Sequence, residues 1–178
     1  DDYSGNYAGL FGFVSGGTVQ NVGLVDGHIT GTTNVGGVVG WNGGTVTDCD
    51  NTGTVTGSET GEWGEVYVGG VVGLNAGGTV QNCYNTGSVT AESENSIACA
   101  GGVVGLNAGG DSTAQVTNCY HTGSVTATST STQDQSSSDT YAGGVVGLNV
   151  GGTVQNCYNT GSVTATSISS IANVGGVV

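Results

Sequence analysis

The stretch GGVVGLNAGGTVQNCYNTGSVTA occupies residues 69–91, and GGVVGLNVGGTVQNCYNTGSVTA occupies residues 143–165. The two copies differ at a single position, where Ala76 of the first becomes Val150 of the second. Copying of this kind indicates a repeat protein, in which the hydrophobic core forms between stacked units rather than inside one unit. The chain is therefore expected to be a series of related units.

The unit has about 32 residues and contains three β-rich runs, Gly-Gly-Val-Val-Gly, Gly-Thr-Val-Gln-Asn and Gly-Ser-Val-Thr-Ala, each closed by Gly or Asn. Short runs of this composition between turn residues predict strands. Helix is disfavoured because no window has a 3.6-residue apolar period and glycine destabilises every turn. The second glycine of the pattern recurs at Gly9, Gly37, Gly70, Gly102, Gly144 and Gly176.

Three short strands cannot bury their own apolar face, but identical units can stack, with each strand pairing to its copy ~4.8 Å away. We expect an all-β fold, a parallel β-solenoid (β-helix) of about five coils with three short strands per coil. Residues 1–178 form one domain, with coils starting near residues 8, 36, 69, 101 and 143 and a sixth begun at 175. The units differ in length at the corners between strands, where a solenoid tolerates insertions. They lie within residues 57–67, 111–114 and 128–140.

The stretch VGGVVGLNAGGTVQNCYNTGSVTA (residues 68–91) closely resembles the GLUG-motif repeat of large bacterial and archaeal surface proteins and adhesins. The resemblance spans about residues 7–178, although NVGLVDGHITG (residues 21–31) has one extra residue and lacks the cysteine. The resemblance to the GLUG-motif family implies no catalytic residues that could be assigned to positions of this chain. The resemblance implies an extracellular location at the cell surface or envelope.

The 178 residues include 13 acidic side chains and no Lys or Arg, so the formal net charge is −13. This balance argues against nucleic acid and anionic membrane surfaces, which both need cationic partners. No apolar run approaches the ~20 residues that a membrane span needs, so we expect no membrane insertion. The chain opens with DDYSGNYAG, as a processed or trimmed protein would.

Residues that occupy equivalent positions in successive units indicate which side chains face inward. One position accepts only small apolar groups and is predicted to face the core; it holds Val22, Cys49, Cys83, Cys119 and Cys157. The position after it is mixed and is predicted to face outward; it holds Gly23, Asp50, Tyr84, Tyr120 and Tyr158. A second inward file is formed by Ile29, Val55, Val89, Val125 and Val163.

Two sets of amides are predicted to form ladders along the solenoid axis, with stacked side chains bonded to one another. The first contains Asn21, Asp48, Asn82, Asn118 and Asn156 at a turn. The second contains Asn42, Asn75, Asn107 and Asn149.

The paired valines of GGVVG present two alternatives. Neighbouring residues of a regular strand face opposite ways, so Val71 or Val72 and its copies would form an exposed apolar stripe that serves as a docking surface. Alternatively, a bulge turns both valines inward.

Four cysteines share the core position described above. Because adjacent coils bring Cα atoms within the range that a disulfide accepts, Cys49 could pair with Cys83, and Cys119 with Cys157, in an oxidising compartment. The alternative is that all four are buried small hydrophobes. Cys99 aligns with Tyr67 and Tyr141 and is therefore expected at the surface, where it could form an intermolecular bridge.

The chain is not expected to be an enzyme and is expected to need no cofactor. His28 and His121 are expected at outward, unrelated sites, and no acid pair recurs beside a base. The pairs Asp48 and Asp50, or Glu92 and Glu94, could touch Ca²⁺, but solvated surface acids are the simpler interpretation. The Ser/Thr-rich residues 126–140 could carry O-glycans.

Three functions are compatible with these observations. The first is a structural surface protein whose coils self-assemble end to end into a fibre, sheath or coat, with Val177 and Val178 among the contacts. The second is a stalk or adhesion segment of a larger adhesin, with ligands on host or neighbouring cells. The third, more remote, is ice binding through the outward Ser/Thr-x-Thr ladder.

Overall fold

The computed structural model of the chain describes residues 7–61, 64–110, 113–131 and 138–178. Within these ranges it consists of strands and turns, and no helix is present. Residues 62–63, 111–112 and 132–137, which belong to the three expected corner insertions and to the O-glycan candidate, lie outside the described residues.

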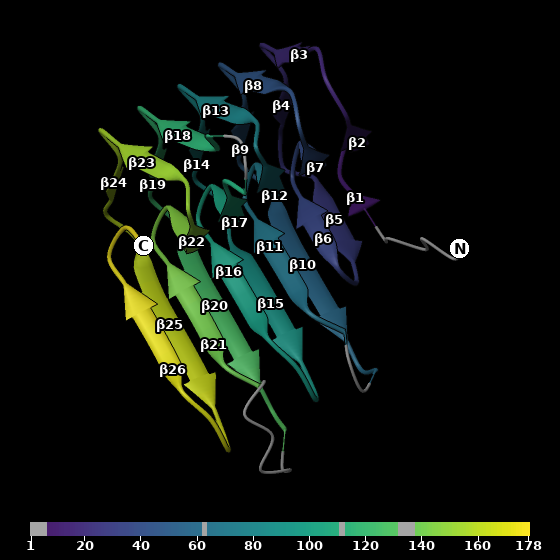
Figure 1. Cartoon of the computed structure of the whole chain (residues 1–178), viewed down its shortest axis with the longest axis vertical. Coiled ribbons are helices and arrows are strands. Elements are labelled where there is room, and N and C mark those ends of the chain that lie inside the picture. The colour runs from purple at the N-terminus through teal and green to yellow at the C-terminus, as the bar shows by residue number, and fades with distance from the viewer. Residues whose placement is uncertain (1–6, 62–63, 111–112, 132–137) are drawn as a thin grey trace.

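Every strand pairs in parallel with its copy in the next coil, which produces five sheets that we call A to E. In Figure 1 the colours follow one another in chain order across each sheet, from purple to yellow. The register matches equivalent residues, for example Val68 with Ala100 and Ala100 with Ala142. The prediction of an all-β parallel solenoid is confirmed.

Sheet A contains β1 (Tyr7–Ala8), β6 (Asn34–Gly36), β11 (Val66–Gly69), β16 (Ala98–Gly101), β21 (Thr140–Gly143) and β26 (Ala172–Gly175). Sheet B contains β2 (Phe11–Val14), β7 (Val39–Asn42), β12 (Val72–Ala76), β17 (Val104–Ala108) and β22 (Val146–Val150). Sheet C contains β3 (Thr18–Gln20), β8 (Thr45–Thr47), β13 (Thr79–Gln81), β18 (Gln115–Thr117) and β23 (Thr153–Gln155).

Sheet D contains β4 (Gly23–Leu24), β9 (Asp50–Asn51), β14 (Tyr84–Asn85), β19 (Tyr120–His121) and β24 (Tyr158–Asn159). Sheet E contains β5 (His28–Gly31), β10 (Thr54–Glu59), β15 (Val89–Ser93), β20 (Ser124–Ser129) and β25 (Ser162–Ser167). A complete coil therefore contributes five strands, and the prediction of three strands per coil is wrong.

Two local features add the extra strands. The backbone N–H groups of Val71 and Val72 both donate to the carbonyl of Val103, at 2.9 Å each, so the chain bends there and divides the expected strand between sheets A and B. Glycine is required at this bend, since a Cβ on Gly69 would lie 1.9 Å from the carbonyl oxygen of Val72. Asn82 has a φ of 54°, a left-handed conformation that Asn tolerates, and it separates the sheet C strand from the sheet D strand.

The same bend decides the orientation of the paired valines. Val71 and Val72 are both fully buried, as are their copies in the neighbouring coils. The exposed valine stripe is therefore wrong, and the alternative, in which both valines point inward, is correct. The copies are Val38, Val39, Val103, Val104, Val145 and Val146.

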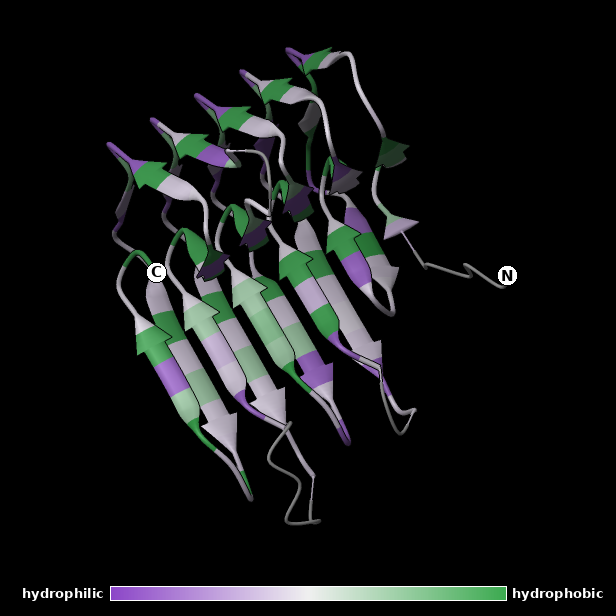
Figure 2. Cartoon of the chain, viewed as in Figure 1, coloured by the Kyte–Doolittle hydropathy of each residue, from purple (hydrophilic) through white to green (hydrophobic). Residues whose placement is uncertain are grey.

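The core divides into two clusters of small side chains. One lies among sheets B, C and D and includes Val71, Val80 and Cys83. The other lies between sheets A and E and includes Val68, Val89 and Ala91. Figure 2 shows the consequence, since bands of similar hydropathy run across neighbouring strands at right angles to the chain. Each side chain packs on its copy along the axis.

Two ladders of buried amides run beside these clusters. Asn75 donates from Nδ2 to the carbonyl of Gly78 at 2.9 Å and to Oδ1 of Asn107 at 2.8 Å. Asn42 and Asn107 donate to the next amide in the same way, which completes the ladder predicted from the sequence. Asn51 and Asn85 begin a second ladder, with a 2.9 Å bond between them, that the sequence analysis missed.

The third ladder lies at the surface and was predicted. Its members Asn82, Asp48 and Asn118 have left-handed φ values between 54° and 55°. Asn82 donates to Asp48 at 3.1 Å and Asn118 donates to Asn82 at 3.2 Å. This ladder links exposed turns, whereas the amides in the inner coils of the two buried ladders are fully buried.

We expect Asn75→Ala to lower the free energy of unfolding by about 2–4 kcal/mol, because it removes the 2.8 Å acceptor of the buried Asn42 Nδ2 group and the 2.8 Å donor to the buried Oδ1 of Asn107. Chemical denaturation measures the change. The exposed-face substitution Thr126→Ala is the control and should cost less than about 0.5 kcal/mol. Equal effects of the two substitutions would contradict the importance of the buried ladder.

Candidate functional site

The four cysteines of the shared position lie in one file on the inner side of the turn before sheet D. Cys49, Cys83 and Cys119 are fully buried, and Cys157, in the last coil, is partly exposed. Each thiol donates to the carbonyl two residues earlier at 3.2 Å, as Cys83 does to Gln81. All five cysteines are free thiols in this structure, so the two disulfides remain predictions.

The thiols of the file influence one another. Hydrogen bonding with the next thiol, together with burial, raises the pKa of Cys83 and Cys119 to about 12. Cys157 has no cysteine after it among the described residues. Hydrogen bonding with the Cys119 thiol lowers the pKa of Cys157 to about 7, despite partial burial. Cys157 is therefore the thiol with the greatest thiolate character, and thiolates are the reactive form.

The prediction that Cys99 lies at the surface is wrong, because its side chain is fully buried. Its strand neighbours Tyr67 and Tyr141 flank it in register, and its thiol donates to the carbonyl of Gly105 at 3.2 Å. The bend between sheets A and B brings that carbonyl over the short cysteine side chain. Burial raises the pKa of Cys99, and a thiol that is fully buried in the folded chain is not available for an intermolecular bridge.

His121 also differs from expectation, since it is fully buried in the second amide ladder and not at an outward site. Its Nδ1 lies 3.1 Å from Nδ2 of Asn85 and 3.0 Å from the Asn85 carbonyl. Its Nε2 has no hydrogen-bond partner among the described residues. Burial lowers the pKa of His121 and keeps the ring neutral, and the two-residue spacing from Cys119 could have indicated this inward position.

The outer face of sheet E carries a regular array of hydroxyl groups. A file of five threonines runs along the axis at the coil spacing of ~4.8 Å: Thr30, Thr56, Thr90, Thr126 and Thr164. A neighbouring file contains Ser58, Glu92, Thr128 and Thr166. The carboxylate of Glu92 interrupts the second file, whereas the threonine file carries a hydroxyl group in all five coils.

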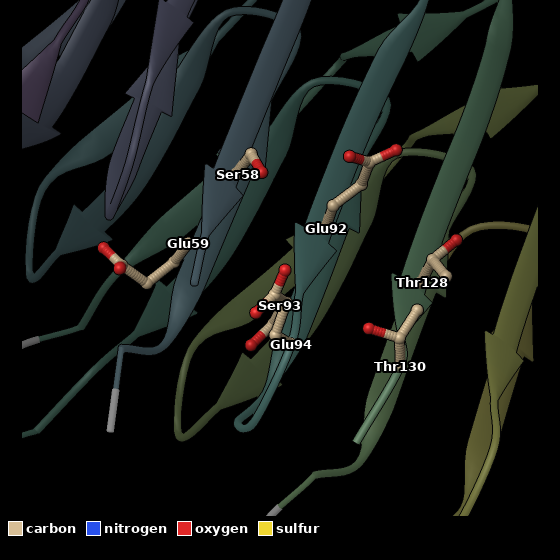
Figure 3. Close-up of a pocket in the computed structure, with 7 residues that line it drawn as sticks. All are labelled: Ser58, Glu59, Glu92, Ser93, Glu94, Thr128 and Thr130. Atoms are coloured by element: carbon tan, nitrogen blue, oxygen red, sulfur yellow. The ribbon is translucent and has the colours of Figure 1, made fainter. Parts of the chain in front are cut away.

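A hollow of about 260 Å³ lies at the end of this face where the sheet E strands finish. Figure 3 shows its lining, with Ser58 and Glu59 on β10, Glu92 and Ser93 on β15, and Thr128 on β20. Glu59 already accepts the backbone N–H groups of Thr60 and Gly61, at 3.0 and 2.8 Å. Among the described residues, no three His, Cys, Asp or Glu side chains gather in a way that could hold a metal ion.

Three tyrosines stack on the outside of sheet D, at the position predicted to face outward. The rings of Tyr84 and Tyr120 lie 5.0 Å apart with planes 4° from parallel, and those of Tyr120 and Tyr158 lie 5.1 Å apart at 3°. The negative charge of Asp50, which precedes them in the file, raises the pKa of Tyr84. The column presents ring edges and hydroxyl groups to solvent.

An apolar file that the sequence analysis missed follows the bend, on the outside of sheet B. It consists of Phe13, Trp41, Leu74, Leu106 and Leu148. Phe13 stacks on Trp41 with ring centroids 4.3 Å apart, and Tyr7 of sheet A contacts Phe13 at 5.4 Å. The large apolar residue that recurs immediately before Asn42 and its copies was the available signal.

The two valines expected to make assembly contacts lie at the end of the chain. Val177 packs against the core cluster of sheets B, C and D, and its carbonyl accepts the N–H groups of Val145 and Val146. Val178 is 50% exposed and lines a hollow of about 330 Å³ with Tyr141 and Leu148.

We expect Cys157 to react first with iodoacetamide at pH 7–8, because it combines exposure with a pKa of about 7. Cys83 and Cys99, which are buried with raised pKa values, should react only on unfolding. Brief alkylation of the native protein followed by peptide mass mapping measures the order. Modification of Cys99 at the rate of Cys157 would contradict the burial described here.

We expect His121→Asn to stabilise the protein, because an amide would continue the ladder from Asn85 to Asn159. The folded-state pKa of His121 is lowered below its unfolded value of about 6.5, so its neutral form stabilises the fold above that pH and this contribution is lost as the pH falls. The variant should therefore show a smaller loss of melting temperature between pH 7 and 5 than the wild type. His28→Asn, on the exposed face, is the control and should retain the pH dependence.

Comparison with protein families finds the GLUG motif at residues 31–56, 64–90 and 138–164. Each match begins before a sheet A strand and ends within the next sheet E strand, so one motif corresponds to one coil. No curated protein and no solved structure matches the chain. Across the described residues, no helix has the length and apolarity that a membrane span requires. Three motif matches, each on one coil of a parallel β-solenoid, identify the chain as a GLUG-motif repeat protein.

Proposed function

We propose that the chain is a non-enzymatic scaffold segment of an extracellular surface protein, a stiff stalk that holds adhesive parts away from the cell. The main support for this proposal is that, in all five sheets, each strand pairs in register with its copy in the next coil throughout the described coils. Each coil contacts its neighbours alone and adds ~4.8 Å to a rod. A rod of variable length but constant cross-section suits a spacer.

The hydrogen bonds of the structure support the same proposal. Strand pairing runs along the axis in every sheet, and the amides of Asn42, Asn75 and Asn107 add side-chain bonds of 2.8 Å in the same direction. Bonds in series along the axis oppose bending as well as slipping of one coil on the next. The outer files of hydroxyl groups and tyrosines would be the faces presented to ligands.

A second candidate is a subunit that polymerises end to end into a fibre, sheath or coat. It is favoured by one observation, that the exposed large apolar side chains of the described residues all belong to the first or the last coil. These are Leu10, Phe11, Phe13, Val25, Val150, Tyr158, Ile168, Ile171, Val174 and Val178. A second copy could cover them, with Val177 and Val178 in the joint. The charge of −13 per chain opposes this contact at low salt.

The stalk proposal predicts that the protein is found outside the cell. In the organism that encodes it, an antibody against residues 7–178 should label intact cells, and brief protease treatment of those cells should remove the signal. A cytoplasmic enzyme followed in parallel controls for lysis. Labelling that requires permeabilised cells would overturn the proposal.

The size of the particles in solution distinguishes the stalk segment from the fibre subunit. The stalk segment should remain a monomer of 17.3 kDa in sedimentation experiments, with or without salt and Ca²⁺. A fibre subunit should form longer particles as salt screens the acidic groups, and Val177→Asp with Val178→Asp should shorten them. Salt-dependent polymers of the wild type would favour the fibre candidate over the stalk.

A further inference from the structure

The cysteine file repeats one side-chain conformation in four coils. Its members are Cys49, Cys83, Cys119 and Cys157. Each Sγ atom lies 3.2 Å from the carbonyl oxygen two residues earlier and 3.6–3.8 Å from a valine carbonyl oxygen of the preceding coil. The backbone is in register there, since the N–H of Tyr84 donates to the carbonyl of Cys49 at 3.1 Å. The four sulfur atoms therefore follow one another along the axis at the coil spacing of ~4.8 Å.

The spacing of the sulfur atoms matches the span of a metal ion held between two thiolates. A metal–thiolate bond is about 2.3 Å long in zinc sites, so two such bonds in line span about 4.6 Å, close to the ~4.8 Å of one coil. A disulfide would bring the two sulfur atoms within about 2.0 Å, and one thiol of each pair would have to leave the shared conformation. The observed arrangement therefore suits a bridging ion better than a direct sulfur–sulfur bond.

The surroundings of the file restrict the kind of ion that could bind. Cys49, Cys83 and Cys119 are fully buried in a core cluster built from valine and cysteine, and the chain has no Lys or Arg to balance a buried anion. Hard cations such as Ca²⁺ and Mg²⁺ take oxygen ligands, whereas thiolates select soft cations. A soft divalent ion with two thiolates is neutral overall, so it avoids the cost of a net charge in the core.

The number of ligands points to the same class of ion. Among the described residues, no three His, Cys, Asp or Glu side chains gather around one point, so the file does not offer the four ligands of a structural zinc site. Neighbouring thiols do face one another, since Cys83 and Cys119 each hydrogen-bond with the thiols of the adjacent coils. The file thus supplies pairs of sulfur ligands, which is the number that a linear site requires.

We infer that the cysteine file of the reduced chain binds soft cations that take two thiolates in line, one between Cys49 and Cys83 and a second between Cys119 and Cys157. At each site two S–H bonds break, two sulfur–metal bonds form and two protons pass to solvent, with no change in oxidation state. Hg²⁺ fits best because its complex with two thiolates is neutral, whereas Cu⁺ or Ag⁺ would leave one negative charge in the core. A disulfide would consume the same thiols.

The test uses Hg²⁺ as the probe on the reduced full chain. The protein is incubated with HgCl₂, and a second sample is refolded with HgCl₂ present so that slow entry into the core cannot conceal a site. Both samples are then dialysed against excess free cysteine. We expect native mass spectrometry to find two ions retained per chain, because two adjacent thiolates in one molecule hold an ion more tightly than separate thiols do. The isolated thiol of Cys99 should lose any ion to the competitor.

Two double variants with the same number of cysteines test whether adjacency matters. Cys49→Val with Cys157→Val leaves the neighbouring thiols of Cys83 and Cys119 and should retain one ion. Cys83→Val with Cys119→Val leaves two thiols that are three coils apart and should retain none. Valine is the residue that the first coil has at this position, as Val22, so the file tolerates it. Circular dichroism and melting establish that both variants are folded.

Equal retention by the two folded double variants would overturn the inference, and so would a wild-type chain that retains no ion after dialysis. X-ray absorption of the loaded wild type supplies a measurement that needs no variant. Two sulfur neighbours at about 2.3 Å would support a linear site, whereas three or more neighbours would contradict it. None of these outcomes bears on the stalk proposal, which the labelling of intact cells tests separately.

Discussion

The buried side-chain amide is the constraint on which the rest of this structure depends. A primary amide without access to water must find both donors and acceptors inside the protein, and here each coil takes them from the coils on either side. A one-residue slip of any strand would place valine against these amides and turn core residues outward. Register is therefore enforced at every coil, which explains why residues 69–91 and 143–165 are almost identical.

The narrow cross-section follows from the same arrangement. Sheets approach closely because the core is built from Val, Ala and Cys, and because glycine stands where a Cβ would strike backbone, as at Gly69. Side chains this short bury little apolar surface per coil, so the stack depends strongly on hydrogen bonds along the axis. His121 is the informative exception, since it occupies an amide position yet leaves Nε2 without a partner in the described residues.

Positions outside the core clusters, the buried amide ladders and the bend glycines vary from coil to coil, and this variation is where function would reside. The file that begins with Gly23 and Asp50 becomes a stacked tyrosine column in later coils, while the neighbouring cysteine file remains small and apolar. The hydroxyl file of sheet E and the apolar file of sheet B lie on other faces. A single scaffold thus carries chemically distinct stripes along its length. The residue type at one position of the repeat determines the chemistry of each stripe.

The sequence by itself determined the repeat, the parallel stacking, the inward cysteine and valine files, and two of the three amide ladders, because each follows from comparing equivalent positions in one chain. The tertiary structure alone decided the five strands per coil, since the bend at Val71 depends on a shared hydrogen bond to Val103 of the next coil. It also decided the burial of Cys99, which aligns with partly exposed tyrosines but is covered where sheets A and B meet. Alternation along a strand predicts which way a side chain points, whereas the path of the neighbouring sheet decides whether water can reach it.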